Sequence, residues 1–336
     1  MLIRTVLDCR PSLGKFYCSL LLLAASWADR VRPHHGLEVV ITGTPPRPLL
    51  AFLEAVGAHW RIAEPDPGLA FVPTGNTLLG GMPSETGERI LLVDNDLYLM
   101  GDLNDLAAVD PDVVAGVPSG HPRVTAEQWR IIESDLGLPT HRNGWDARGV
   151  ELANRLNGRD RPTRFARTYI NGGVLLLPRD GAFVDRWRAH IVAIADRFRG
   201  TAMDTRAVCG SNMAGLATAV GAHERFQWLG EEYNYRHLHV LLDILPVETV
   251  SILHLTGDPR QDEAIDPSRY VSQYVELYWT NRVIRRLENH PDRFGATAAA
   301  RVRETVAQLS ESMLGTVRTH DLDGVMEAVA AGSPSL

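Results

Sequence analysis

The sequence predicts an α/β fold with a mostly parallel central sheet flanked by helices, followed by a C-terminal helical extension. Two observations predict the sheet. Short apolar runs with the composition of strands alternate with stretches of helical periodicity, which is the pattern of β-α-β units. The most apolar run lies between two glycines and has the character of a strand covered on both faces. A third observation predicts the extension, because the chain has helical periodicity from Pro267 onward.

The expected elements follow from periodicity and from turn residues at their ends. The expected strands are Ile3–Leu7, Leu37–Thr42, Trp60–Ala63, Ile90–Met100, Val113–Val117, Tyr169–Pro178 and Val250–Leu255. The expected helices are Leu13–Val31, Pro48–Ala58, Asn76–Leu79, Asp102–Val109, Ala182–Phe198, Ser211–Val220, Ser268–Leu287, Ala296–Thr316 and Leu322–Ala331. No internal repeat interrupts this order.

The central strand carries two carboxylates near its expected end, in the run Ile90–Met100. Residues two apart on an extended backbone point to the same side, so Asp94 and Asp96 should lie about 6.6 Å apart along the strand. Two buried like charges are costly unless a cation lies between them. Oxygen ligands suit Mg²⁺ or Mn²⁺. The alternative is a pair of solvated turn acids or helix caps, and the Asp-x-Asp pattern alone leaves both open.

Composition excludes some classes of partner. The chain has 336 residues, 45% of them hydrophobic and 22% charged, which is ordinary for a globular protein. Its formal net charge of −7 argues against nonspecific nucleic-acid binding, which needs a basic surface. Lys15 is the only lysine, so a phosphate site must use arginine, histidine, backbone amides or a metal.

Cysteine usage and hydropathy bear on location. The three cysteines are an odd number without metal-binding spacing, which favours a reducing, cytoplasmic setting. The apolar run Phe16–Ala28 is too short to span a bilayer. It follows a strand-like segment, so we expect a buried first helix in place of a signal peptide, and no transmembrane segment.

Three further segments bear on a site. Residues 118–167 are polar and arginine-rich and form an expected insertion with some helix that overhangs the site. The strand that starts Asn171-Gly172-Gly173 would let another group approach the backbone closely, although a bulge or turn explains the glycines equally well. His254 stands near the end of the last strand, where a structural histidine is more common than a ligand.

The order of these features resembles one known family. An apolar strand with Asp94-x-Asp96, the Asn171-Gly172-Gly173 strand start, a small-residue helix, a Tyr233-Asn234 turn and the segment from His254 to Gly257 follow one another. The series resembles the retaining glycosyltransferases of family eight, which include glycogenin and the lipooligosaccharide galactosyltransferases and have the GT-A fold. The resemblance covers residues 1–262, expected as the glycosyltransferase domain. Residues 263–336, the helical extension, lie outside it, as does the insertion.

The resemblance implies a metal and a nucleotide sugar. Asp94, Asp96 and His254 would hold Mn²⁺ or Mg²⁺, which would bind the diphosphate of the donor, with a UDP-sugar favoured. Asp8, at the end of the first strand, looks like the position that contacts the nucleoside. Asn95, between the two acids, would also be a donor-binding residue.

Three more positions match the donor site of the family. Asn171 is similar to the asparagine of an Asn-Ser-Gly strand near the donor sugar, and Gly172 would lie against the donor. Gly257 matches the glycine of a His-x-x-Gly turn against the phosphates. These residues and Asp8 would complete the binding of the nucleotide sugar.

The sequence departs from the family at two places. An Asp-Gln pair precedes the small-residue helix in the family, whereas Ser211-Asn212 stands here, so Asn212 is the expected amide near the reaction centre. The Lys-Pro-Trp after the glycine is also absent, and Arg260 is the expected phosphate partner in its place. Asn171, Asn212 and Arg260 are therefore the candidate catalytic residues.

The resulting hypothesis is a metal-dependent glycosyltransferase with an unknown acceptor, a glycan, protein or small molecule. No strong general base stands out, which suits retention with the leaving phosphate as base. A catalytically weakened nucleotide-sugar-binding or scaffold protein is the alternative. A haloacid dehalogenase-type phosphatase lacks its downstream lysine, and a nucleotidyltransferase lacks its lysine-bearing loop. The C-terminal helices are a candidate homodimer contact.

Overall fold

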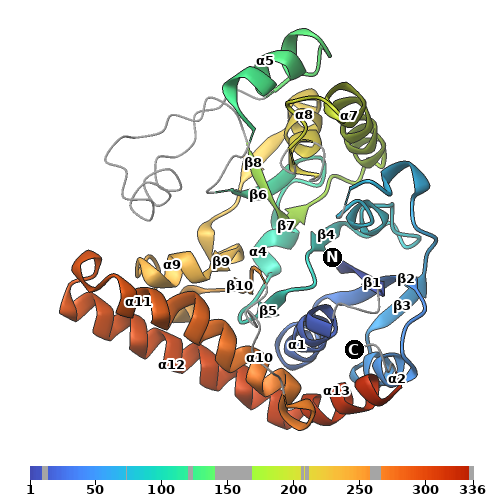
Figure 1. Cartoon of the computed structure of the whole chain (residues 1–336). Helices are drawn as coiled ribbons and strands as arrows, with labels where there is room; N and C mark the ends of the chain where they lie inside the picture. Colours follow the sequence, from blue (N-terminus) through green and yellow to red (C-terminus); the bar gives the residue numbers. More distant parts are fainter. Residues whose placement is uncertain are drawn as a thin grey trace. The chain divides into compact units, whose positions relative to one another are not determined.

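The structure is a computed structural model that describes residues 1–9, 14–72, 74–119, 124–140, 169–205, 208, 212–257 and 266–332. Seven strands form one sheet in the order β3-β2-β1-β4-β7-β6-β8, and three form a second in the order β5-β10-β9 (Figure 1). The pairs β2/β3, β1/β4 and β6/β8 are parallel, while β7 runs antiparallel to β4 and β6. The expected α/β architecture with a mostly parallel sheet is confirmed.

The elements alternate in sequence as expected. The strands are β1 Leu2–Cys9, β2 Gly36–Gly43, β3 His59–Ile62, β4 Ile90–Val93, β5 Leu97–Leu99, β6 Val114–Pro118, β7 Ile170–Leu176, β8 Phe226–Trp228, β9 Tyr235–Arg236 and β10 Ile252–His254. The helices before β10 are α1 Gly14–Arg30, α2 Arg47–Val56, α3 Thr77–Gly80, α4 Asn104–Ala108, α5 Ala126–Ser134, α7 Ala182–Phe198, α8 Met213–His223 and α9 His237–Leu241. After it come α10 Tyr270–Trp279, a π-helical turn η5 Thr280–Ile284, α11 Arg285–Asn289, α12 Ala296–Thr319 and α13 Leu322–Ala331.

The chain divides into two compact units. Unit 1 comprises Met1–Val6, Ala63–Asp94 and Asp105–Gly230, and unit 2 comprises Leu7–Ile62, Asn95–Asn104 and Glu231–Leu336. The sequence-based boundary at residue 262 follows a resemblance, and these contact-based units do not test it. Most of the expected insertion, residues 120–123 and 141–167, lies outside the described residues.

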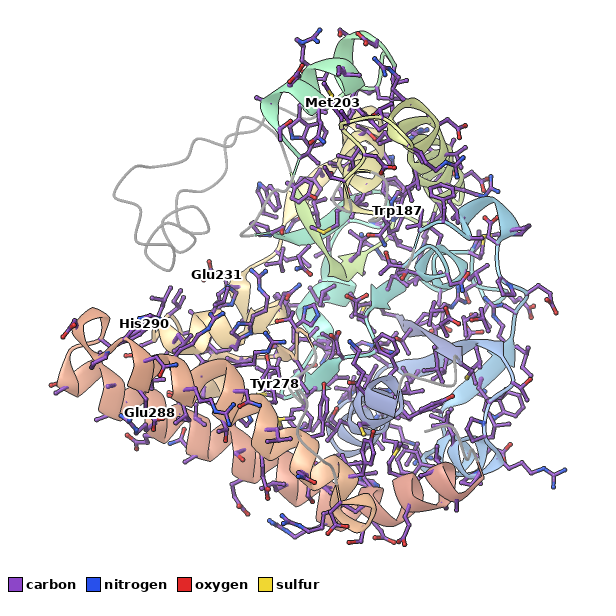
Figure 2. The ribbon with its side chains drawn as sticks, in the orientation of Figure 1. Trp187, Met203, Glu231, Tyr278, Glu288 and His290 are labelled. Carbon is purple, nitrogen blue, oxygen red and sulfur yellow. The ribbon has the colours of Figure 1, made fainter. Side chains whose placement is uncertain are left out.

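Unit 1 is held by an apolar core and by two buried arginines. Strand and helix residues such as Leu92, Leu175 and Trp187 (labelled in Figure 2) are fully buried in one cluster. Arg4 donates to the carbonyl of Gly80 at 3.2 Å, and Arg89 donates to the carbonyl of Leu177 at 3.0 Å. Burial lowers the pKa of Arg89 to about 10, so it stays charged at neutral pH. Both guanidinium groups satisfy loop carbonyls that the core would otherwise leave without donors.

Unit 2 packs the C-terminal helices against the first helix and the small sheet. α1 is almost entirely buried, as expected of a core helix. Its Ser19 Oγ lies 3.1 Å from the hydroxyl of Tyr274 in α10, and its Ser26 Oγ accepts the amide of Leu99 at 3.0 Å. Tyr98 of β5 reaches Thr316 Oγ1 of α12 at 2.9 Å. The C-terminal helices therefore contribute to the same core as the strand that follows Asp96.

The N-terminus of α10 is capped from the last helix. Asp323 Oδ1 accepts the backbone amides of Val271 at 2.7 Å and Ser272 at 3.0 Å, and Oδ2 accepts the Ser272 hydroxyl at 2.5 Å. These bonds satisfy amides that have no partner inside the helix. In the part of the chain that is described, no helix is long and apolar enough to cross a membrane.

Candidate metal and nucleotide-sugar site

The apolar run Ile90–Met100 is two strands: the first ends directly before Asp94, as expected, and the residues after Asp96 form a second strand that was not expected. β4 ends at Val93 in the large sheet, and β5 begins at Leu97 in the small sheet. Asp94, Asn95 and Asp96 form the bend between them and are half-buried. The spacing expected for extended backbone therefore does not apply to the two carboxylates. The acids lie on the loop where the chain leaves the large sheet.

Strand pairing brings Asp96 to His254. β10 runs antiparallel to β5 with His254 opposite Leu97, and the amide of Leu255 donates to the carbonyl of Asp96 at 2.7 Å. Nε2 of His254 then lies 3.0 Å from Oδ1 of Asp96. The His254 side chain is 4% exposed and that of Asp96 is 22% exposed. A half-buried carboxylate and a buried imidazole thus face each other.

Asn234 fixes the proton on the imidazole. Its Oδ1 lies 3.0 Å from Nδ1 of His254, so with the carbonyl oxygen facing the ring, Nδ1 carries the proton and donates it. Asn234 is completely buried, which holds this arrangement in place. In the neutral ring Nε2 then presents a lone pair to Asp96. A partner that orients the far nitrogen is the usual support of a histidine that binds a metal.

The pair fits a metal ion better than a hydrogen bond. Oδ1 of Asp96 is buried and has no hydrogen-bond donor among the described residues, although Nε2 is 3.0 Å away. Two lone pairs at that distance repel each other, and either a metal ion between them or a second proton on the ring removes the repulsion. In an octahedral site with metal–ligand distances of about 2.1 Å, adjacent ligand atoms are about 3.0 Å apart. Ligand atoms of Asp94, Asp96 and His254 all lie within 4.8 Å of one another.

Unit 1 brings the other expected donor residues together. The amide of Asp94 donates to the carbonyl of Gly173 at 2.9 Å, beside the start of β7. Asn171 uses its Oδ1 to accept the amide of Gly173 at 2.9 Å. A Cβ on Gly172 would lie 3.7 Å from Oδ1 of Asn212, an ordinary contact. Asn171, Gly172 and Asn212 therefore lie near Asp94, as the resemblance implied, and their part in the reaction stays a prediction.

Asp8 lies at the end of β1 in a polar setting. The hydroxyl of Thr42 donates to its Oδ1 at 3.3 Å. Its charge helps burial to raise the pKa of Cys9 to about 11, so that thiol is protonated at neutral pH. β1 and β4 pair in parallel; Asp8 lies in the last two residues of β1 and Asp96 follows β4, so both are at the carboxyl ends of neighbouring strands. Ligands of α/β sheets bind at such ends.

Gly257 adopts a conformation that favours glycine. Its φ is +90°, and a Cβ there would lie 2.9 Å from Cζ of Arg282. The turn after His254 is therefore closed against a guanidinium group that comes from the C-terminal helices. Sequence reasoning gave Arg282 no role, because it stands far along the chain in a helical stretch with no motif. Arg260 and Ser211, which the sequence analysis singled out, lie outside the described residues.

Behind the turn lies a buried group of basic and aromatic side chains. Tyr278, labelled in Figure 2, donates from α10 to the carbonyl of His254 at 3.2 Å. Nδ1 of His237 lies 3.2 Å from the hydroxyl of Thr256. Burial, then the nearby Arg286 and Arg282, lower the pKa of His237 to about 3. His237 is consequently neutral, and the positive charge here belongs to arginines.

Comparison with solved structures identifies the fold. A crystal structure of an active-site mutant of LgtC matches with a TM-score of 0.52 and 13% identity, over 84% of this chain and 100% of that one. A complex of the galactosyltransferase LgtC with donor and acceptor sugar analogues matches at 0.48 and 14%, over 84% and 100%. The glycosyltransferase GlyE of Streptococcus pneumoniae TIGR4 matches at 0.47 and 13%, over 84% of this chain and 61% of that one. No protein-family model and no curated protein matches the sequence.

The fold implied by the resemblance is therefore confirmed. The chain has the fold of the LgtC structure, which is the GT-A fold of glycosyltransferases. At 13% identity the match establishes the fold and leaves the chemistry to the residues of this chain.

Proposed function

We propose that this chain is a metal-dependent glycosyltransferase that moves a sugar from a nucleotide diphosphate to an acceptor. The observation that carries the proposal is the contact between Asp96 and His254, with Oδ1 and Nε2 facing each other at 3.0 Å. Asn234 holds the imidazole so that its lone pair faces the acid. A site of this kind at the end of a strand on a GT-A fold suits the diphosphate of a nucleotide sugar.

Asp94, Asp96 and His254 would hold Mn²⁺ or Mg²⁺. When bound, the ion supplies Lewis-acid stabilisation of the negative charge that develops on the leaving diphosphate. Asp8 would contact the nucleoside at the end of β1, with Asn95 and Gly172 beside the donor. Asn171 and Asn212 would offer amide groups to the donor sugar.

Retention of configuration is part of the proposal. No side chain at this set of positions is placed as a strong base, so the leaving phosphate would accept the proton of the acceptor. A UDP-sugar donor and a cytoplasmic location also remain predictions. The location rests on cysteine usage, and the cysteines that are described, Cys9 and Cys18, are free thiols.

A donor screen tests the proposal. Purified protein with Mn²⁺ would be incubated with UDP-, GDP- and ADP-sugars, with and without a mixture of candidate acceptors, and released nucleotide measured. We expect release with one nucleotide class, loss of release with EDTA, and recovery with Mn²⁺. The Asp96→Asn variant should release none, while Asp292→Asn, an exposed acid outside the site, should match the wild type.

The same screen separates the enzyme from a binding protein. Ser211-Asn212 stands where the family has an Asp-Gln pair, so the carboxylate of that pair is missing here. This difference is the reason to keep the binding protein as the alternative. A ligand at about 100 times its dissociation constant adds roughly 2.7 kcal/mol to the free energy of unfolding. If a nucleotide sugar raises the melting temperature accordingly but no acceptor yields free nucleotide, the chain is a binding protein. If neither binding nor release is seen, the proposal is wrong.

A further inference from the structure

We propose that Arg282, in the C-terminal helices, is the cation that binds the diphosphate of the donor. The inference rests on the proposed function and deepens it, because it assigns a residue outside residues 1–262, the segment in which the sequence motifs of the family are found. From the sequence alone, Arg260 was the expected phosphate partner. The only lysine, Lys15, lies in α1 with its ammonium group 4.8 Å from the ring centroid of Phe16. Among the side chains that are always charged at neutral pH, only arginine therefore remains for this task.

The first observation is the packing of Arg282 on Gly257. Cζ of the guanidinium would be 2.9 Å from a Cβ at position 257, and Nη1 would be 3.5 Å away. Real Cβ atoms do not come as close as 2.9 Å, so a side chain at position 257 would force the guanidinium to move from this place. Gly257 follows His254 in the turn that the resemblance places against the phosphates. The guanidinium thus lies on the backbone of that turn.

The second observation connects Arg282 to the metal site. Tyr278 stands one helical turn before it and donates to the carbonyl of His254 at 3.2 Å. Burial and the carboxylate of Asp96 raise the pKa of this hydroxyl, whereas Arg282 lowers it. The hydroxyl is therefore within electrostatic range of both side chains. All of these residues belong to unit 2.

The third observation is that three guanidinium groups lie near His237. Burial lowers the pKa of His237 most, and the charges of Arg286, Arg282 and Arg236 lower it further. Burial, and then the charge of Arg282, lower the pKa of Arg286. Guanidinium groups this close to one another create a positive field that attracts an anion. Arg282 is only partly buried, so a ligand can reach it.

A diphosphate has the matching chemistry. Guanidinium groups bind phosphate oxygens through paired, charge-assisted hydrogen bonds. With the metal site at His254 and the guanidinium at Gly257, three residues along the same segment, the two positive centres would bind one small anion. The two adjacent phosphate groups of a nucleoside diphosphate carry their negative charge close enough together to contact both centres.

The test measures the affinity for UDP in the presence of Mn²⁺ by calorimetry, with UMP as the comparison ligand. GDP or ADP replaces UDP if the donor screen favours them. The variants are Arg282→Gln, Arg282→Lys, Arg260→Gln and, as a matched control, Arg303→Gln, which removes an exposed arginine of α12. Loss of a charged hydrogen bond predicts that Arg282→Gln weakens UDP binding about 10- to 100-fold, with a smaller effect on UMP. Arg303→Gln should bind as the wild type does.

The outcomes separate this inference from the proposed function. If the wild type binds no nucleoside diphosphate, the proposed function fails and this inference fails with it. If the wild type binds UDP and Arg282→Gln binds equally well, or only Arg260→Gln loses affinity, this inference alone is overturned. Should Arg282→Gln unfold, Arg282→Lys decides: it keeps the charge and should lose affinity several-fold without a change in melting temperature.

Discussion

Replacing Asp96 with asparagine should have opposite effects with and without metal. In the absence of metal, Oδ1 of Asp96 is a buried acceptor for which the described residues offer no donor, 3.0 Å from Nε2 of His254. An unsatisfied buried polar group costs roughly 1–3 kcal/mol. The asparagine amide can turn an N–H toward Nε2 and remove this cost. We therefore expect Asp96→Asn to be more stable than the wild type in EDTA, by about 1–3 kcal/mol.

With metal the order reverses. Mn²⁺ at about 100 times its dissociation constant adds roughly 2.7 kcal/mol to the wild type. Asp96→Asn loses a charged ligand, and we expect its Mn²⁺ affinity to fall roughly 100-fold or more, so that little of this gain remains. Each kcal/mol corresponds to about 2–4 °C in melting temperature for a large domain. Melting curves in EDTA and in Mn²⁺ therefore measure both signs.

Two results would refute this reasoning. If Asp96→Asn is less stable than the wild type in EDTA, the acid is instead the partner of a protonated His254. If Mn²⁺ stabilises both proteins equally, Asp96 is not a ligand. The Asp292→Asn variant controls for the general effect of removing an exposed negative charge.

The remaining predictions concern the surroundings of the site. His237 has a pKa of about 3 in the folded protein and about 6.5 in the unfolded chain, so its contribution to stability is complete above about pH 6.5 and falls as the pH drops toward 3. Urea unfolding should show the free energy of unfolding fall by roughly 2 kcal/mol between about pH 6.5 and pH 5, and His237→Gln should reduce this fall. Asp323→Ala removes three hydrogen bonds at the start of α10 and should lower the free energy of unfolding by about 1–3 kcal/mol, and an unchanged melting temperature would contradict the cap. Gly257→Ala should weaken UDP binding because the methyl group displaces Arg282, whereas Gly87→Ala, also at positive φ but with open space around its Cβ, should not.

Sequence patterns predicted the fold class well, because strands and helices alternate along the chain and each has its own local hydrophobic periodicity. α7 was expected at Ala182–Phe198 and has those bounds. The break between β4 and β5 was missed because apolar residues on both sides of Asp94 and Asp96 are equally suited to one long strand or two short ones. Which sheet each run joins depends on partners far along the chain.

The candidate site could be predicted only in part. Asp96 and His254 were singled out by motif, and the structure brings them together. Asn234 was noted only as part of a turn, because its contact with the imidazole depends on the parallel pairing of β9 with β10. Arg282 carried no signal at all, since its position depends on how the C-terminal helices pack.

The π-helical turn η5 has a consequence for how this helix tolerates change. A π turn holds one residue more than an α-helical turn, so α10 and α11 are out of phase across it. Deleting a single residue from Thr280–Ile284 would let an unbroken α-helix form, and the side chains on both sides would keep their directions, because the π turn already holds the additional residue. The same deletion inside an ordinary α-helix would rotate every later side chain by about 100° around the axis. The face of α10 that carries Tyr274 and Tyr278 and the face of α11 that carries Arg286 would therefore keep their relation after loss of one residue at this turn.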